Sequence, residues 1–185
     1  MNIKGQEAGP FELLVAVVMM GFVLIIGLQA MDMVQKNSCR QQTDKTLEDF
    51  KTALELVSKS NEQKKTFLDF PDCGQKKDQT LRMEIQQDPA LCSKLCTTAR
   101  PTCVLLKLYN PSFSMSKCVT MPALTNFSTD STACGEVENH VLVSLFSEQD
   151  IQQGSWQFRN ITSAGSAGTP IICAFQECKG TQCSS

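Results

Sequence analysis

The chain has 185 residues, the length of one ordinary domain with an accessory segment, which excludes a multidomain machine. Its 17 Lys and Arg against 19 Asp and Glu give a net charge of -2, so no excess of basic side chains is present to neutralise a phosphate backbone, and we expect no nucleic acid as a ligand. Ten cysteines leave two classes open, a metal-rich intracellular protein and a disulfide-stabilised extracellular one.

The first predicted element is an apolar helix near the N-terminus. Residues 13–28 read LLVAVVMMGFVLIIGL without a charge, and with its flanks the span approaches the roughly 20 residues that cross a bilayer. The run is longer than the roughly 7–15 apolar residues of a secretory signal, and Lys4 is the only basic residue ahead of it. Pro10 suits the first helical position and puts Glu12 in the first turn. We therefore expect a membrane segment at about 11–30.

A second, amphipathic stretch follows the apolar one. Four apolar residues recur at spacings of three, four and three and so share one helix face: Leu47, Phe50, Leu54 and Val57. Glu55 and Lys59 are spaced for a supporting ion pair. Because no Pro or Gly separates the two stretches, we expect one nearly continuous helix from Pro10 to about Ser60.

From about residue 61 the pattern changes to short strands. Leu81, Met83 and Ile85 alternate with polar residues, which is typical of a half-buried strand. Further candidates are a short helix at Ala90–Cys96 and strands at Thr102–Tyr109, Lys117–Met121, His140–Phe146, Ser155–Thr162 and Ile171–Gln176. Residues 163–168 predict a flexible loop. The sequence thus predicts an α+β fold, in which a long N-terminal helix precedes a small antiparallel β domain at 61–185.

The cysteines favour disulfides over metal. The candidates for pairing are Cys39, Cys73, Cys92, Cys96, Cys103, Cys118, Cys134, Cys173, Cys178 and Cys183. Paired C-x2-C knuckles, the strong zinc signal, do not occur, and we expect no metal. Nine cysteines lie in the predicted β domain, which we call the head, and Cys39 lies on the helix. If all ten cysteines form disulfides, Cys39 must therefore pair with a cysteine of the head or of a neighbouring chain. The pairing itself does not follow from the sequence.

No constellation of catalytic residues stands out. His140 is the only histidine and lies in a strand-like apolar run, where a half-exposed structural histidine is the better interpretation. No phosphate-binding loop or H-E-x-x-H motif occurs. We therefore expect no enzymatic activity and no cofactor.

Two Asn-x-Ser/Thr tripeptides are candidates for glycosylation. They begin at Asn126 and Asn160, whereas the tripeptide at Asn110 is disqualified by its proline.

The N-terminal residues carry a resemblance to a known family. Lys4-Gly5 followed by Gln6 and then by an apolar helix resembles the archaeal type IV pilin-like proteins with a class III signal peptide. The resemblance implies that a prepilin-type peptidase removes residues 1–5 and that 6–60 is the mature helix. The family places a Glu at the fifth mature position, which is Pro10 here. Either Glu12 takes that role, or the cut falls after Gly9.

The resemblance also implies a way of assembly. The precursor would sit in the membrane with its head outside, and after cleavage the pilus assembly machinery would polymerise identical subunits through the apolar helix. The residues implied for assembly are Glu12, Leu13, Leu14, Val17, Val18, Gly21, Phe22 and Ile25. Two other classes stay open: an anchored binding or adhesin domain that does not polymerise, and a secreted protein released near Met31.

Overall fold

The computed structural model describes residues 9–60, 62–71, 79–96, 103–110, 113–122, 125–146, 150–162 and 169–178. The chain divides into two compact units, Met1–Gln41 and Gln42–Ser185, which we describe separately. Cys73, Cys183 and the predicted loop at 163–168 lie outside the described residues.

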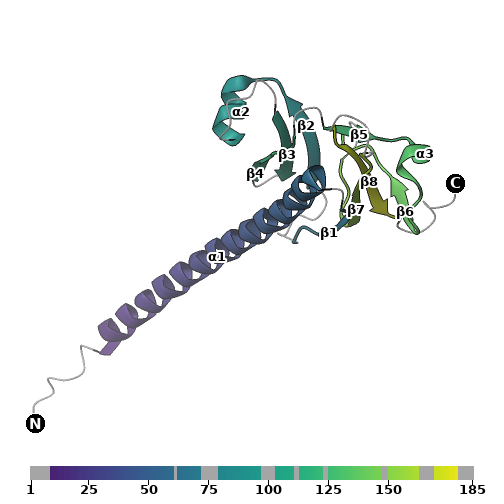
Figure 1. Cartoon of the computed structure of the whole chain (residues 1–185). Coiled ribbons are helices and arrows are strands. Elements are labelled where there is room, and N and C mark those ends of the chain that lie inside the picture. The colour runs from purple at the N-terminus through teal and green to yellow at the C-terminus, as the bar shows by residue number, and fades with distance from the viewer. Residues whose placement is uncertain are drawn as a thin grey trace, which may run out of the picture. The chain divides into compact units, whose positions relative to one another are not determined.

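The long helix, α1, runs from Gly9 to Lys59 over 51 residues (Figure 1). The expectation of one helix from Pro10 to about Ser60 is confirmed. Good helix formers such as Leu, Met, Gln, Glu and Lys make up much of its length, and it has no glycine after Gly27 and no proline after Pro10. Lys59 in the last turn faces the negative end of the helix dipole, which it stabilises.

The described residues of the head form two sheets. Sheet A has the order β1-β7-β8-β5, with β6 pairing β8 off this path, and sheet B has the order β2-β3-β4. The strands of sheet A are β1 Lys64–Leu68, β5 Asn126–Ser128, β6 His140–Leu142, β7 Gly154–Asn160 and β8 Ile171–Glu177. The strands of sheet B are β2 Thr80–Gln86, β3 Cys103–Asn110 and β4 Phe113–Val119. Each pairing is antiparallel except β5 with β8, which is parallel.

Two short helices complete the described part of the head. Helix α2, Pro89–Cys96, follows β2, and helix α3, Ser131–Cys134, follows β5 (Figure 1). Asp130 starts α3 as its N-cap, because its carboxylate accepts the amide of Thr132, and Gly135 ends it at a φ of 69°. The expected helix at Ala90–Cys96 is confirmed as α2, whereas α3 was not foreseen.

The core of the head forms around the last turns of α1. The predicted stripe is fully buried: Leu47, Phe50, Leu54 and Val57. It shares one apolar cluster with Trp156 and Phe158 of sheet A and with Leu106 and Leu108 of sheet B. Each such side chain contributes about 1.5–3 kcal/mol when it leaves water. Residues 42–59 of α1 therefore belong to the head as its central packing element.

Several predicted strands differ from the observed ones. Strand β4 begins at Phe113 rather than Lys117. The sequence pattern missed its first residues because serines alternate with Phe113 and Met115 and weaken the apolar signal. Strand β6 ends at Leu142 rather than Phe146, since Leu145 and Phe146 both turn toward the core and consecutive strand residues cannot share a face. The short strands β1 and β5 were missed. Ile85 was expected inside with Leu81 and Met83, but it is 57% exposed, whereas those two residues are buried.

One predicted ion pair is also wrong. Glu55 does not pair with Lys59; its Oε1 accepts the backbone amide of Thr120 at 2.7 Å. This bond satisfies the backbone amide that follows the end of β4. The spacing of residues along the helix cannot predict this contact with a distant strand.

Candidate functional site: the apolar half of the long helix

The apolar half of α1 exposes its hydrophobic side chains around its whole circumference. Every large hydrophobic residue from Phe11 to Val34 is exposed, from 43% at Val15 to 72% at Met20. An 18-residue window reaches a mean hydropathy of 2.7 with none of it buried. By length and composition, this helix suffices to cross a membrane. A surface of this kind needs an apolar partner on every side.

Charged residues mark both ends of the apolar span. Glu12 lies in the first turn and Asp32 is the next charged residue, twenty positions later, which corresponds to about 30 Å of helix and matches the hydrocarbon core of a bilayer. Asp32 accepts a 2.7 Å bond from Lys36, and both side chains are largely exposed. An exposed ion pair is stable beside water rather than in hydrocarbon. The span therefore ends close to Asp32.

The residues implied for assembly lie on this surface. The large ones are all exposed: Leu13, Leu14, Val17, Val18, Phe22 and Ile25. Gly21 is half-buried, and a Cβ placed on it would meet nothing within 4 Å, so the single chain leaves this position open. Glu12 is exposed at the start of the span. The processing residues Lys4, Gly5 and Gln6 lie outside the described residues.

The described cysteines of the head form disulfides. Three bridges are Cys92–Cys103, Cys96–Cys118 and Cys134–Cys173, with Cα atoms 5.7, 5.1 and 5.8 Å apart. Cys39 and Cys178 are disulfide-bonded as well. Two bridges tie α2 to strands β3 and β4, and the third ties α3 to β8. The disulfide interpretation of the cysteines is thus confirmed for the described residues.

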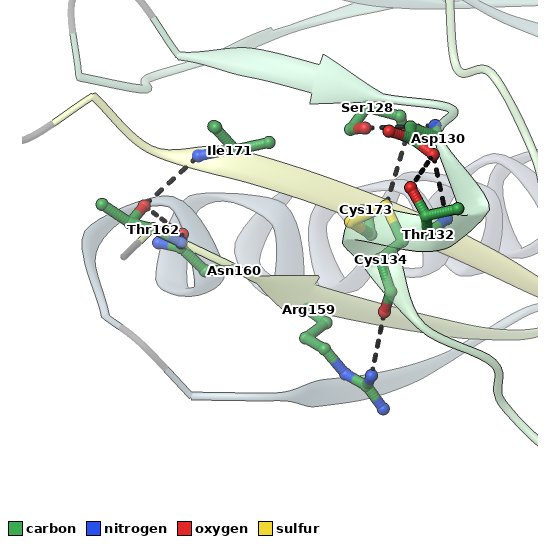
Figure 2. Close-up of a disulfide and its surroundings, with 9 residues drawn as sticks. All are labelled: Ser128, Asp130, Thr132, Cys134, Arg159, Asn160, Thr162, Ile171 and Cys173. Atoms are coloured by element: carbon green, nitrogen blue, oxygen red, sulfur yellow. Dashed lines mark hydrogen bonds between the residues drawn. A yellow bond between two sulfur atoms is a disulfide. The ribbon is translucent and has the colours of Figure 1, made fainter. Parts of the chain in front are cut away.

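Figure 2 shows how the third bridge is supported. Arg159 of β7 donates from Nη1 to the backbone oxygen of Cys134 at 3.0 Å. Its guanidinium also lies 5.6 Å from the ring centre of Phe175. Asp130 accepts from the hydroxyl of Thr132 at 2.7 Å and from its amide at 2.9 Å. These two bonds lower the pKa of Asp130. The arrangement stabilises α3 and its disulfide and offers no reactive group.

Paired charges line the contact of α1 with sheet B. Lys117 of β4 bonds Asp44 at 2.8 Å and Glu48 at 3.3 Å, and Lys51 bonds Glu48 at 2.7 Å. The Lys51 hydrogen bond is the main cause that lowers the pKa of Glu48. Burial lowers the pKa of Lys117, but its two carboxylate partners outweigh burial and raise it. This network was not foreseen, because Lys117 is 69 residues or more from its partners in sequence.

His140 has a structural environment. It begins β6 and is half-buried, as expected, and its Nδ1 donates to the backbone oxygen of Glu138 at 2.7 Å. That partner is a carbonyl rather than a carboxylate or a nucleophile, so the hydrogen bond orients the ring and activates nothing. Among the described residues, no group of three or more His, Cys, Asp or Glu is placed to hold a metal ion.

The two glycosylation candidates occupy different settings. Asn126 begins β5 and is exposed, whereas Asn160 ends β7 and is half-buried.

Comparisons with protein-family models, with curated proteins and with solved structures found no match to this chain. A function is therefore inferred from the apolar helix, the disulfides and the N-terminal motif.

Proposed function

We propose that the protein is a structural subunit of an extracellular type IV pilus-like filament. It is inserted as a membrane precursor, processed by a prepilin-type peptidase and polymerised through its apolar N-terminal helix. The observation that carries this proposal is the exposure of every large hydrophobic side chain from Phe11 to Val34, around the whole helix. Lipid supplies apolar partners on all sides before assembly, and identical helices supply them afterwards.

When the apolar helix leaves the bilayer and packs against other helices, the hydrophobic free energy changes little. Lipid tails are as apolar as leucine side chains, so close packing rather than the hydrophobic effect has to favour association. Gly21 and Gly27 have open space around them in the single chain, which permits the close approach of another helix. The apolar half of α1 is therefore suited both to a bilayer and to a bundle of its own copies.

The N-terminal motif supports processing. Cleavage after Gly5 would leave Gln6 with a new α-amino group, six residues before the carboxylate of Glu12 in the first turn of α1. An amine and a carboxylate buried among apolar helices require each other, since an unpaired buried charge is costly. Glu12 would thus pair with the Gln6 amine of its own or a neighbouring subunit.

The disulfides support a head outside the cytoplasm. Stable bridges form in oxidising compartments and are rare where thiols are kept reduced. Basic residues beside the span do not decide its orientation, because Lys4 stands before it and Lys36 and Arg40 after it, and a long domain crosses largely regardless of charge.

A second candidate is an anchored extracellular binding domain that never polymerises. The match between the Glu12–Asp32 span and the bilayer thickness favours it as much as the filament subunit. The two differ in processing and in assembly. The membrane anchor is common to both.

Intact mass and N-terminal sequencing of the membrane fraction and of sheared extracellular material test the proposal. A chain that starts at Gln6 and occurs in filaments seen by electron microscopy supports it. A chain that starts at Met1 and stays in the membrane supports the anchored domain, and a soluble chain that starts near Met31 supports the secreted one. Either of the last two results overturns the filament proposal.

A further inference from the structure

Two tripeptides with the same glycosylation signal begin on strands that flank β8, and their asparagines have opposite environments. Asn126 begins β5, and Asn160 ends β7. The signal requires a free side-chain amide on the asparagine and a hydroxyl two residues later. Whether each amide is free is therefore the deciding observation.

The Asn160 amide is fully engaged. Its Nδ2 donates to the backbone oxygens of Val57 at 3.0 Å and of Ser60 at 3.2 Å, at the C-terminal end of α1. Its Oδ1 accepts from both the amide and the hydroxyl of Thr162, and that hydroxyl also accepts the amide of Ile171 at 3.3 Å (Figure 2). The last carbonyls of a helix have no partner within the helix. The side chain of Asn160, at the end of β7, therefore acts as a C-terminal cap of α1.

A sugar on Asn160 is incompatible with this cap. Both hydrogens of Nδ2 are used, one for each carbonyl, and an N-linked sugar replaces one of them. The remaining N–H can satisfy only one carbonyl, and the sugar would have to occupy the place of the other.

The Asn126 amide is accessible. Asn126 is exposed, and its side chain makes no hydrogen bond with the described part of the chain, whereas its backbone amide donates to the backbone oxygen of Pro170 at 2.9 Å. Phe127 between the two signal residues faces the core, where its ring packs edge-on against Phe146. Because strand side chains alternate, Asn126 and Ser128 face the other way together.

We propose that Asn126 is the N-glycan acceptor of the head and that Asn160 is a structural cap of α1. The proposal rests on the proposed function only in placing the head outside the cytoplasm. In the reaction, Nδ2 of Asn126 forms a bond to the anomeric carbon of a lipid-linked sugar phosphate. The bond from that carbon to the phosphate oxygen breaks, the lipid phosphate leaves with the bonding electrons, and the amide nitrogen loses one proton. No oxidant or reductant is needed.

Intact-mass and glycopeptide analysis of the full chain, isolated from the membranes and filaments of its native host, tests the assignment. Asn126→Gln and Ser128→Ala are expected to lose the glycan mass completely, and Ser128→Thr to retain it. Asn160→Gln and Thr162→Ala are expected to keep the full glycan mass. In detergent, Asn160→Gln should lower the Tm by roughly 5 °C, because two helix-end carbonyls lose their donor, while Asn126→Gln should leave the Tm unchanged.

The same spectra separate this proposal from the proposed function. A glycan at Asn160, or a disulfide-bonded chain without a glycan at Asn126, overturns the assignment whatever the N-terminus. A start at Met1 with a glycan at Asn126 overturns the filament function and leaves the assignment standing.

Discussion

Phe50 of α1 meets Trp156 of β7 edge-on, with ring centroids 5.8 Å apart and planes at 88°. Both residues are fully buried, and the indole Nε1 donates to the backbone oxygen of Gln152 at 2.9 Å. Edge-on aromatic pairs add about 0.5–1.5 kcal/mol beyond the area they bury. This contact joins residues 42–59 of the helix to sheet A and makes the helix end a part of the head.

Phe50→Ala is expected to destabilise the head by about 3–5 kcal/mol, because it leaves a cavity between Trp156 and Phe158. Denaturant unfolding of the full chain in detergent, followed by Trp156 fluorescence, measures the change. Leu56→Ala is the matched control, since Leu56 lies on the same helix but is 48% exposed, and it should cost under about 1 kcal/mol. Equal losses for the two variants would contradict the packing described.

We expect the stability of the head to decrease slightly at acid pH because of Glu48. Its folded pKa lies below its ordinary value of 4.5, chiefly through the Lys51 hydrogen bond. The stabilisation is therefore complete above about pH 4.5 and is lost as the pH falls through the folded pKa. Because Glu48 is 42% exposed, we expect less than about 1 kcal/mol. In Glu48→Gln, the free energy of unfolding should fall less between pH 6 and pH 3 than in the unchanged protein, and an identical fall in both would disprove the role of Glu48.

The disulfides are expected to differ in their contribution to stability. Cys134–Cys173 closes a separation of 39 residues and Cys92–Cys103 one of 11, so loop-closure entropy predicts losses of about 4 and about 3 kcal/mol. Paired Cys→Ser variants under non-reducing denaturation measure both. Thiol labelling of the unfolded, unreduced protein should find no free thiol. Extensive labelling would return the cysteines to the metal interpretation.

Gly21→Leu separates assembly from membrane anchoring. In the single chain, the position is open, and leucine is more apolar and a better helix former, so membrane insertion should be unchanged. In a filament, the added side chain should hold neighbouring helices apart. A cost of about 1.4 kcal/mol would weaken each subunit contact about tenfold, and we expect filament yield to fall sharply. Gln41→Leu adds the same side chain beyond the apolar span and should leave filaments intact. Normal filaments from Gly21→Leu would place Gly21 outside the packing surface.

Val18→Asp tests whether the apolar helix forms the filament core. One carboxylate near the middle of the span costs roughly 3 kcal/mol on insertion scales, which the remaining apolar residues offset, so the chain should stay in the membrane with a folded head. Among packed apolar helices, the same charge has no partner, and filaments should be lost. Carbonate extraction and electron microscopy measure the two outcomes. Filaments that survive the substitution would show that another surface polymerises.

The sequence by itself determined the long helix and the location of its two halves. An uninterrupted apolar run and a regular stripe at Leu47, Phe50, Leu54 and Val57 are local patterns, and the 3.6-residue period converts them directly into exposed and buried faces. The disulfide chemistry also followed from the sequence, because cysteine number and spacing exclude paired zinc knuckles. Strand β2, which alternates clearly, and strand β3, which is rich in apolar residues, were found within one or two residues.

Tertiary structure alone decided the features that join distant residues. The partners of Cys134 and Cys96, the Lys117 ion pairs and the bond from Glu55 to Thr120 depend on which strands become neighbours, and sequence spacing does not encode this. The short strands β1 and β5 exist because a longer strand supplies their hydrogen bonds. The two glycosylation signals show the physical reason most directly. Both tripeptides match the same signal, and only the fold brings the Asn160 amide to the backbone oxygens of Val57 and Ser60.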